Sequence, residues 1–241
     1  MTAGPKLLDG EAPFGVDHLR ELMIGATTAV DALRGVGAYW PPHGSTGIAH
    51  LCDVCRLPIP AVGVCSQLCA ELHGRLLLDF ATFSTAKTVE PLMRVFKDTP
   101  SPVGWIAGFF AGLAQSTFAH RAELDHSVLI VVPHSRERSW SPNATIWREV
   151  VSGRSQESVA RRASSRVDRG RIDPHAFDVT GISSGVHAIV LDDLWTTGAT
   201  IGSLAAALLA NGNTVGAWTI GRQLRPNGPA TTAAYKSMSD Q

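Results

Sequence analysis

The pattern of apolar and polar positions divides the second half of the chain into alternating strands and helices. Short apolar runs rich in β-branched residues, typical of buried strands, lie at 127–133, 186–192 and 214–220. A helical apolar pattern at 201–210 separates the last two runs and ends before an Asn-Gly pair. A strand, a helix and a second strand in this order form a parallel βαβ unit. The pattern therefore predicts an α/β fold, with a parallel sheet flanked by helices.

Helical patterns dominate the first half of the chain. Apolar residues recur at helical spacing over 16–36, and an apolar helix is predicted over 103–118. The most apolar part of that helix, at 103–114, is too short for a membrane span and favours a buried helix. Residues 143–166 carry a charged helical pattern, whereas the pattern of residues 76–94 fits either a helix or a strand.

Composition narrows the choice of partner. The 241 residues include 21 basic and 21 acidic side chains, and the mean hydropathy is +0.07. This balance provides no overall attraction to nucleic acid or to anionic lipid, so a small-molecule partner is favoured over nucleic acid. The first residues mix charges, prolines and apolar side chains instead of forming a charged leader with an apolar core. We therefore expect a cytoplasmic protein that does not associate with membranes.

Acidic and hydroxyl residues follow the strand predicted at 186–192. In the stretch IVLDDLWTTGAT, Asp192 and Asp193 stand where that strand is expected to end. The carboxyl edge of a parallel sheet is where open α/β folds bind ligands. The chain then turns into the predicted helix, so backbone amides of the first turn and threonine hydroxyls form a cradle for a phosphate. The residues of this cradle are Thr196, Thr197, Gly198, Ala199 and Thr200.

The two carboxylates need a partner other than the phosphate. They would repel a phosphate in direct contact, whereas the hydroxyls of a vicinal diol can donate to both. Gly198 suits the loop because a side chain there would hold an anion away from the backbone and disfavour a positive φ. A phosphate and a diol together describe a ribose 5-phosphate. The alternative is that these residues only end a strand and cap a helix, with no ligand.

All four cysteines of the chain lie within one short segment. They are Cys52, Cys55, Cys65 and Cys69. The spacing, Cys-x2-Cys, nine residues and Cys-x3-Cys, suits a tetrahedral zinc ion. A reducing cytoplasm disfavours disulfides between them. Four ordinary buried thiols are the alternative, and His50 or His73 can replace one cysteine as a ligand.

These two motifs resemble a known family. Residues 189–200 resemble the phosphoribosyl-pyrophosphate (PRPP) binding motif of type I phosphoribosyltransferases, which have a five-stranded parallel core and a smaller hood. A cysteine cluster ahead of such a domain resembles the ComF-like family, named for a competence protein of DNA uptake. The similarity covers most of residues 50–224. Within it, 89–97 is similar to the stretch before the first core helix of that family, and 129–134 to its pyrophosphate-loop strand.

The resemblance implies a function. Asp192 and Asp193 would hold the ribose hydroxyls and orient the ring for catalysis. The loop from Thr196 to Thr200 would bind the 5-phosphate, and Mg²⁺ would bind the pyrophosphate. Zinc would be structural. The protein would bind PRPP or a ribonucleoside monophosphate and transfer phosphoribosyl to or from a nitrogenous acceptor, with pyrophosphate; a homodimer is compatible with this. The alternative is a PRPP-sensing or competence accessory protein that binds without turnover.

The segment after the strand at 127–133 departs from the family pattern. It reads HSRERSWSPNATIW and lacks the arginine-glycine-aromatic-asparagine run of the relatives, although two arginines and Asn143 remain. We take His134, Ser135 and Arg136 as candidate pyrophosphate contacts. The alternative for His134 is that it is an ordinary loop residue. The arginine-rich stretch 159–177 is either a loop that closes over the pyrophosphate or a solvated basic helix face followed by a turn.

These features divide the chain into four parts. We expect a helical extension over 1–48, a zinc-ribbon-like module with the four cysteines over 49–75, a phosphoribosyltransferase-like domain over 76–225 and a tail over 226–241. The expected fold is thus an α/β fold of the type I phosphoribosyltransferase kind with a small N-terminal zinc module.

Overall fold

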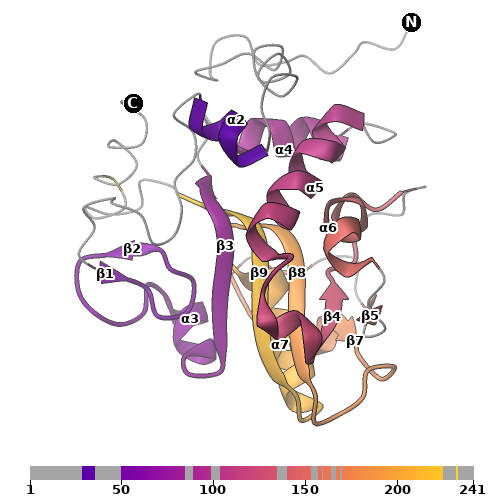
Figure 1. The fold of residues 1–241 in the computed structure, drawn as a ribbon. Helices are drawn as coiled ribbons and strands as arrows, with labels where there is room; N and C mark the ends of the chain where they lie inside the picture. The colour runs from indigo at the N-terminus through magenta and orange to yellow at the C-terminus, as the bar shows by residue number, and fades with distance from the viewer. Residues whose placement is uncertain are drawn as a thin grey trace, which may run out of the picture.

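A five-stranded sheet forms the centre of the molecule (Figure 1). The structure, a computed structural model, describes residues 29–35, 50–84, 89–98, 104–134, 140–152, 157–158, 160–163, 167–168, 170–224 and 232. In spatial order the strands are β3 (Leu76–Ser84), β9 (Thr214–Gln223), β8 (His187–Trp195), β4 (Ser127–Val131) and β5 (Glu157–Ser158). All neighbouring strands pair in parallel. The predicted α/β fold with a parallel sheet is confirmed.

Alternating side chains of β8 enter two different hydrophobic clusters. Ile189 and Leu191 join the cluster on one face of the sheet, whereas Ala188 and Val190 join the cluster on the other. Strands of a parallel sheet that are buried on both faces need apolar residues at every position. The continuous apolar run that predicted this strand is therefore explained by burial from two sides.

Among the described residues, four helices cover the face that carries Ile189 and Leu191. They are α2 (Ala29–Gly35), α4 (Val89–Asp98), α5 (Gly104–Phe118) and α6 (Pro142–Val151). The predicted apolar helix is α5, whose Phe109 and Phe110 are fully buried in this cluster. In the part of the chain that the structure describes, no helix is both long enough and apolar enough to cross a bilayer.

The opposite face is covered by α7 and by the cysteine module. The elements there are α7 (Ala199–Ala210), α3 (Gln67–Leu72), the hairpin of β1 (His50–Leu51) and β2 (Pro58–Ile59), and the pair β6 (Arg161–Arg162) and β7 (Phe177–Asp178). Two short 3-10 helices, η1 (Ala122–Asp125) and η2 (Pro174–Ala176), complete the described elements.

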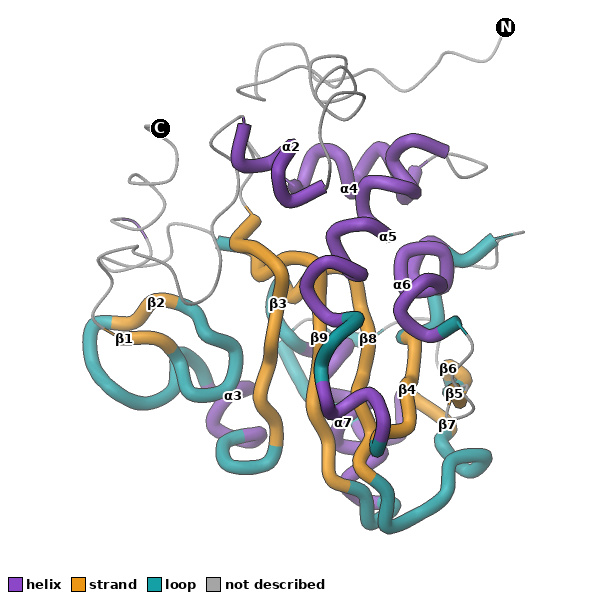
Figure 2. Tube along the Cα trace, viewed as in Figure 1, coloured by secondary structure: helices purple, strands orange, loops and turns teal. Residues whose placement is uncertain are grey.

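The cysteine module lies against the outer edge of β3 (Figure 2). The Leu78 amide, on that edge, donates a hydrogen bond of 2.9 Å to the Val54 carbonyl. The module also contributes Cys52, Cys55 and Leu72 to the hydrophobic cluster that contains α7. An uncovered edge strand is prone to pair with other chains, so the module protects the sheet as well as holding its cysteines.

The strand that precedes the loop is longer than its apolar run predicts. We expected it to end as the carboxylates begin, but β8 runs through Asp192 and Asp193 to Trp195. The reason is that β9 continues alongside it, so that Asp192 pairs with Thr219 and Trp195 with Arg222. Asp192 and Asp193 end the apolar pattern, but the backbone hydrogen bonds between β8 and β9 continue past them.

The helix predicted over 143–166 is shorter than expected, and this prediction was wrong in its second half. The helix α6 ends at Val151, and β5 and β6 follow. Its buried residues Ile146, Trp147 and Val150 form one stripe that ends with the helix. Beyond that stripe the sequence is charged and offers no apolar face that packing can stabilise. The ambiguous stretch 76–94 resolves into β3 and the start of α4.

The chain leaves β4 and β8 toward opposite faces of the sheet. After β4 it enters α6 on one face and reaches β5, whereas after β8 it enters α7 on the other face and reaches β9. Such a reversal is a topological switch point, and it opens a crevice at the carboxyl ends of the two strands. A ligand site is therefore expected where β4 and β8 end.

Two glycine substitutions test the packing. A Cβ atom on Gly221, in β9, would lie 2.5 Å from Leu194 Cδ2 and 3.1 Å from Ser84 Cβ. Gly221→Ala is therefore expected to destabilise the protein by about 1 to 3 kcal/mol, through overpacking. Gly108→Ala, at an exposed position of α5 where a Cβ meets nothing within 4 Å, is the control and should stabilise by about 0.5 to 1 kcal/mol. Chemical denaturation measures both, and equal effects would contradict the described register.

Candidate functional site

A cavity of about 570 Å³ opens at the switch point. It is bounded by the end of β4, the end of β8, the start of α7, and α4. The lining residues used below are Glu90, Arg94, Lys97, His134, Asn143, Val167, Asp192, Asp193, the loop from Trp195 to Thr200, and Gln223. Small-molecule sites commonly occupy about 300 to 1,000 Å³, so this cavity is large enough for a sugar phosphate.

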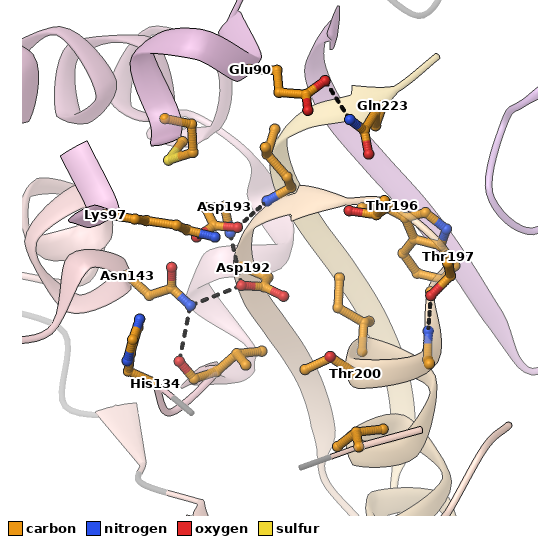
Figure 3. Close-up of a pocket in the computed structure, with 18 of the residues that line it drawn as sticks. Glu90, Lys97, His134, Asn143, Asp192, Asp193, Thr196, Thr197, Thr200 and Gln223 are labelled. Carbon is orange, nitrogen blue, oxygen red and sulfur yellow. Dashed lines mark hydrogen bonds and ion pairs between the residues drawn. The ribbon is translucent and has the colours of Figure 1, made fainter. Parts of the chain in front are cut away.

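Asp192 is a buried carboxylate whose second oxygen faces the cavity. Its Oδ1 accepts hydrogen bonds from Asn143 Nδ2 at 2.8 Å and from the Asp193 amide at 2.9 Å. Asn143 also donates to the Val132 carbonyl, which ties α6 to the end of β4. Figure 3 shows the other oxygen of Asp192 pointing toward the start of α7, where Thr200 lies. That oxygen is placed to accept from a ligand.

Asp193 has different partners although it is the next residue. One of its oxygens forms an ion pair with Lys97 of α4, and the other accepts from the Leu194 amide at 2.5 Å. Successive side chains of a strand leave the backbone in different directions, which explains why the two carboxylates separate. The structure thus brings both to the cavity, and Asp192 is the one that presents an oxygen to it.

The electrostatics of the pair are set by burial. Desolvation, and then the charge of Asp193, raise the pKa of Asp192 to about 7. The pKa of Lys97 is raised, because attraction to Asp193 and Asp192 outweighs a desolvation that acts in the opposite sense. Titratable groups with strongly shifted pKa values inside a cavity are a common property of functional sites.

The loop between β8 and α7 turns at Gly198. This residue has φ +89°, and a Cβ there would lie 2.3 Å from the ring of Trp195. Glycine is therefore required by the backbone and by the indole packed beneath it, before any ligand is considered. The prediction from sequence identified the need for a positive φ but not the role of Trp195, which is fully buried.

The threonines of the loop have separate roles. Thr197 Oγ1 accepts from the Ala199 amide at 3.3 Å, one residue before the N-cap position of α7, where Gly198 forms no side-chain cap bond. Thr196 and Thr197 are exposed, whereas Thr200 is half-buried beside the cavity. Amides in the first turn of a helix have no acceptor within the helix, and those of α7 start at the cavity. The loop therefore has the groups that the predicted phosphate cradle requires.

The candidate pyrophosphate contacts are only partly described. His134 lines the cavity after β4, whereas Ser135 and Arg136 lie outside the described residues. In the arginine-rich stretch, Arg161 belongs to β6, which pairs with β7, so the helical form of the solvated-face hypothesis was wrong at this position. Val167 of the same stretch lines the cavity. Closure of this stretch over a ligand stays a prediction.

Several cavity residues had no motif in the sequence. Lys97 lies on α4, and Glu90 of the same helix pairs with Arg94 and with Gln223 of β9. Asn143 was noted only as a remnant of a family pattern, yet it is the direct partner of Asp192. The spacing of Glu90, Arg94 and Lys97 along one side of α4 was the available indication.

The four cysteines converge as the spacing predicted. Their sulfur atoms all lie within 4.8 Å of one another, with Cys55 and Cys69 at 3.4 and 3.5 Å from Cys65. Four sulfurs around a zinc ion at Zn–S distances of about 2.3 Å are separated by roughly 3.8 Å, so the geometry and the donor set fit zinc. His50 and His73 are not members of this cluster, although His73 lies 3.4 Å from the Asp53 carboxylate.

The thiols of the cluster share their protons unequally. Hydrogen bonds from Cys55, Cys65 and Cys69 lower the pKa of Cys52, and the bond to Cys52 raises the pKa of Cys69. A metal ion binds thiolates and displaces these protons. The cluster is therefore a candidate structural metal centre, on the opposite side of β3 and β9 from α4.

Comparisons of the chain with models of protein families, with curated proteins and with solved structures each found no match. The class of protein that the structure itself defines is an α/β protein with a parallel sheet, a cavity at its switch point and a four-cysteine cluster.

Metal analysis tests the cysteine cluster. Protein purified without chelator should carry about one zinc ion per chain, because four sulfurs stand at suitable distances. Cys52→Ser should lose the zinc and destabilise the module while the parallel sheet stays folded. Ser66→Ala is the control, since Ser66 caps α3 next to the cluster without offering a sulfur. Absence of zinc by elemental analysis, with four freely titrating thiols, would contradict the assignment.

Replacing Asp192 tests its ionisation. Because the pKa of Asp192 rises from 3.8 to about 7 on folding, the folded chain keeps a proton that the unfolded chain releases. Stability therefore falls as the pH rises from about 4 to 7. Asp192→Asn keeps the accepting oxygen and removes this titration, so the variant should match the parent at pH 4 and exceed its stability by roughly 1 to 3 kcal/mol at pH 8. Denaturation at several pH values measures the difference.

The control for this experiment is Thr117→Val, which removes a hydroxyl that bonds within α5 and replaces one uncharged side chain by another. Its effect on stability should be the same at each pH of the series. If the difference between Asp192→Asn and the parent stays constant from pH 4 to 8, Asp192 does not take up a proton on folding.

Proposed function

We propose that the cavity binds the ribose 5-phosphate part of PRPP or of a ribonucleoside monophosphate, and that the chain is a phosphoribosyltransferase-like protein of the ComF-like kind. One observation carries this proposal. The Asp192 carboxylate and the loop from Thr196 to Thr200 line a single cavity, on opposite sides of it. A group that accepts from hydroxyls and a group that donates to a phosphate are thus both present, separated by space for a sugar.

The charges in the cavity favour a ligand that arrives with a cation. Glu90, Asp192 and Asp193 stand against Arg94 and Lys97, and two of these carboxylates are already paired with those cations. A bare pyrophosphate would be repelled by such a lining. Mg²⁺ bound to the pyrophosphate oxygens would enter as part of the substrate and reduce that repulsion.

The reaction we propose is substitution at C1 of the ribose. A nitrogen of the acceptor forms a bond to C1 while the bond from C1 to the pyrophosphate oxygen breaks, and the pyrophosphate leaves with its Mg²⁺. Positive charge develops on the sugar ring in such a transition state, and the Asp192 carboxylate would favour it electrostatically. Asp193, held by Lys97, would keep the end of β8 in position. The loop before α7 would fix the ring through the 5-phosphate.

Binding without turnover is the second candidate. The segment after β4 lacks the arginine-glycine-aromatic-asparagine run that is typical of the family the chain resembles. This favours a protein that senses PRPP or serves DNA uptake as an accessory. Release of pyrophosphate in the presence of a panel of nitrogenous bases distinguishes the two: a transferase releases it, whereas a sensor binds PRPP and releases none.

Calorimetry on the full chain tests the ligand. The protein with Mg²⁺ should bind PRPP, and ribose 5-phosphate should bind better than its 2-deoxy analogue. Asp192→Asn should weaken PRPP binding at least tenfold, since a charge-assisted hydrogen bond contributes about 1.5 to 3 kcal/mol. It should also reduce the preference over the 2-deoxy analogue. Thr200→Val removes one hydroxyl and should weaken all 5-phosphorylated ligands by about two- to tenfold.

Matched variants control for general effects. Asp79→Asn changes a strand carboxylate that pairs with Arg121 away from the cavity, and Thr117→Val removes a hydroxyl that bonds within α5. Both should bind PRPP as the parent does. We avoid Gly198 as a test position because its substitution would clash with Trp195 whether or not a phosphate binds. Absence of heat with PRPP and Mg²⁺ at millimolar concentration would reject the proposed function.

A further inference from the structure

Arg222 is a buried cation near the end of β9, between the cysteine cluster and the loop before α7. Its residue is 4% exposed. Nε donates to the Cys55 carbonyl at 3.0 Å, and Nη2 lies 3.3 Å from Cys55 Sγ. On the other side Nη1 donates to the carbonyls of Trp195 and Thr196 at 3.1 and 3.2 Å. One guanidinium therefore touches a cysteine of the cluster and the first residues of the loop.

The contacts on the loop side hold the turn that leads to Gly198. The carbonyls of Trp195 and Thr196 belong to the residues at which β8 ends and the loop begins. The Trp195 ring packs beneath Gly198, so a shift of the Trp195 backbone moves the indole and the turn above it. The guanidinium is planar and donates in fixed directions. It can therefore fix the orientation of two carbonyls relative to Cys55.

The contacts on the cysteine side depend on the metal centre. Among the described ion pairs none joins Arg222 to a carboxylate, and a buried cation needs a negative or strongly polar partner. A sulfur that binds zinc does so as a thiolate. The metal also fixes the position of Cys55, in the segment between Cys52 and Cys65, because a bound ion holds its ligands in one geometry.

We infer that Arg222 couples the metal centre to the candidate phosphate loop, so that zinc bound by the four cysteines positions the loop. Arg222 is a positioning residue in this arrangement and does not itself line the cavity. Loss of zinc releases Cys55, the guanidinium loses two of its anchors, and the carbonyls of Trp195 and Thr196 become free to rotate. The role assigned to the loop rests on the proposed function, whereas the coupling itself does not.

Amide hydrogen exchange of the full chain tests the coupling without any ligand. Peptides that span 194–203 are compared in zinc-loaded and zinc-stripped protein, for the parent and for Arg222→Met. In the parent, removal of zinc should speed exchange in these peptides by about tenfold, while peptides of α5 stay unchanged. Zinc-loaded Arg222→Met should already exchange at the faster rate, and removal of its zinc should add little, because effects that share one route are not additive.

Matched variants keep the test decisive. Arg121→Met removes a guanidinium that pairs with Asp79 and should behave as the parent does. If Arg222→Met fails to retain zinc, Arg222→Lys is used instead; it keeps the charge beside Cys55 but cannot reach both sides, so it should give the same loop exchange as Arg222→Met. Parent-like exchange in a zinc-loaded Arg222 variant, or an equal effect of zinc removal in variant and parent, would overturn the inference.

PRPP binding supplies the second measurement. In the parent, removal of zinc should weaken PRPP at least fivefold, and zinc-loaded Arg222→Met should show the same loss. If the parent binds no PRPP, the proposed function fails while the exchange experiment still decides the coupling. If PRPP binds equally with and without zinc, the coupling has no effect on the site, and the inference fails while the proposed function stands.

Discussion

The parallel pairing of β8 between β4 and β9 sets where the two carboxylates and the loop of the candidate site lie. The pairing with β4 brings the ends of two strands to one edge, and the opposite directions of α6 and α7 open the cavity there. The pairing with β9 extends β8 beyond its apolar run and sets Trp195 opposite Arg222. A slip of one residue in this register would turn Asp192 to the other face of the sheet. The cavity, the loop and the link to the cysteines thus depend on one ladder of hydrogen bonds.

Elements that are buried on both sides could be predicted from sequence, because their apolar patterns are continuous. The strands β4, β8 and β9, and the helices α5 and α7, all overlap predicted segments, although β8 and β9 run three residues beyond theirs and α7 begins two residues earlier. Boundaries set by partners elsewhere in the chain could not be predicted. Asp192 and Asp193 resemble the end of a strand in sequence, but β9 supplies pairing partners beyond them. The charged stretch after Val151 kept a helical pattern without an apolar face to pack.

The candidate site divides in the same way. Groups contiguous in the chain, such as the loop to Thr200 and the two cysteine pairs, follow from local chemistry and spacing. Partners that meet only in the fold do not. Asn143 contacts Asp192 across 49 residues, and Arg222 contacts Cys55 across 167. Lys97 likewise reaches Asp193 from another helix. These three side chains determine how the local motifs are oriented, and their identities carry no local pattern that would reveal the pairing.

The cavity contains several features that reduce stability. These features argue against the alternative that the residues of the loop only end a strand and cap a helix. The N-cap of α7 is Gly198, which forms no side-chain cap bond, and the Ala199 amide next to it donates to Thr197 Oγ1. The structure also buries two adjacent carboxylates and leaves Asn143 Oδ1 and Trp195 Nε1 buried without a partner among the described residues. Unsatisfied polar groups and unfavourable charge burial cost free energy. A helix cap requires neither the buried carboxylates nor the unpaired polar atoms, whereas a ligand cavity requires acceptors and donors at this place.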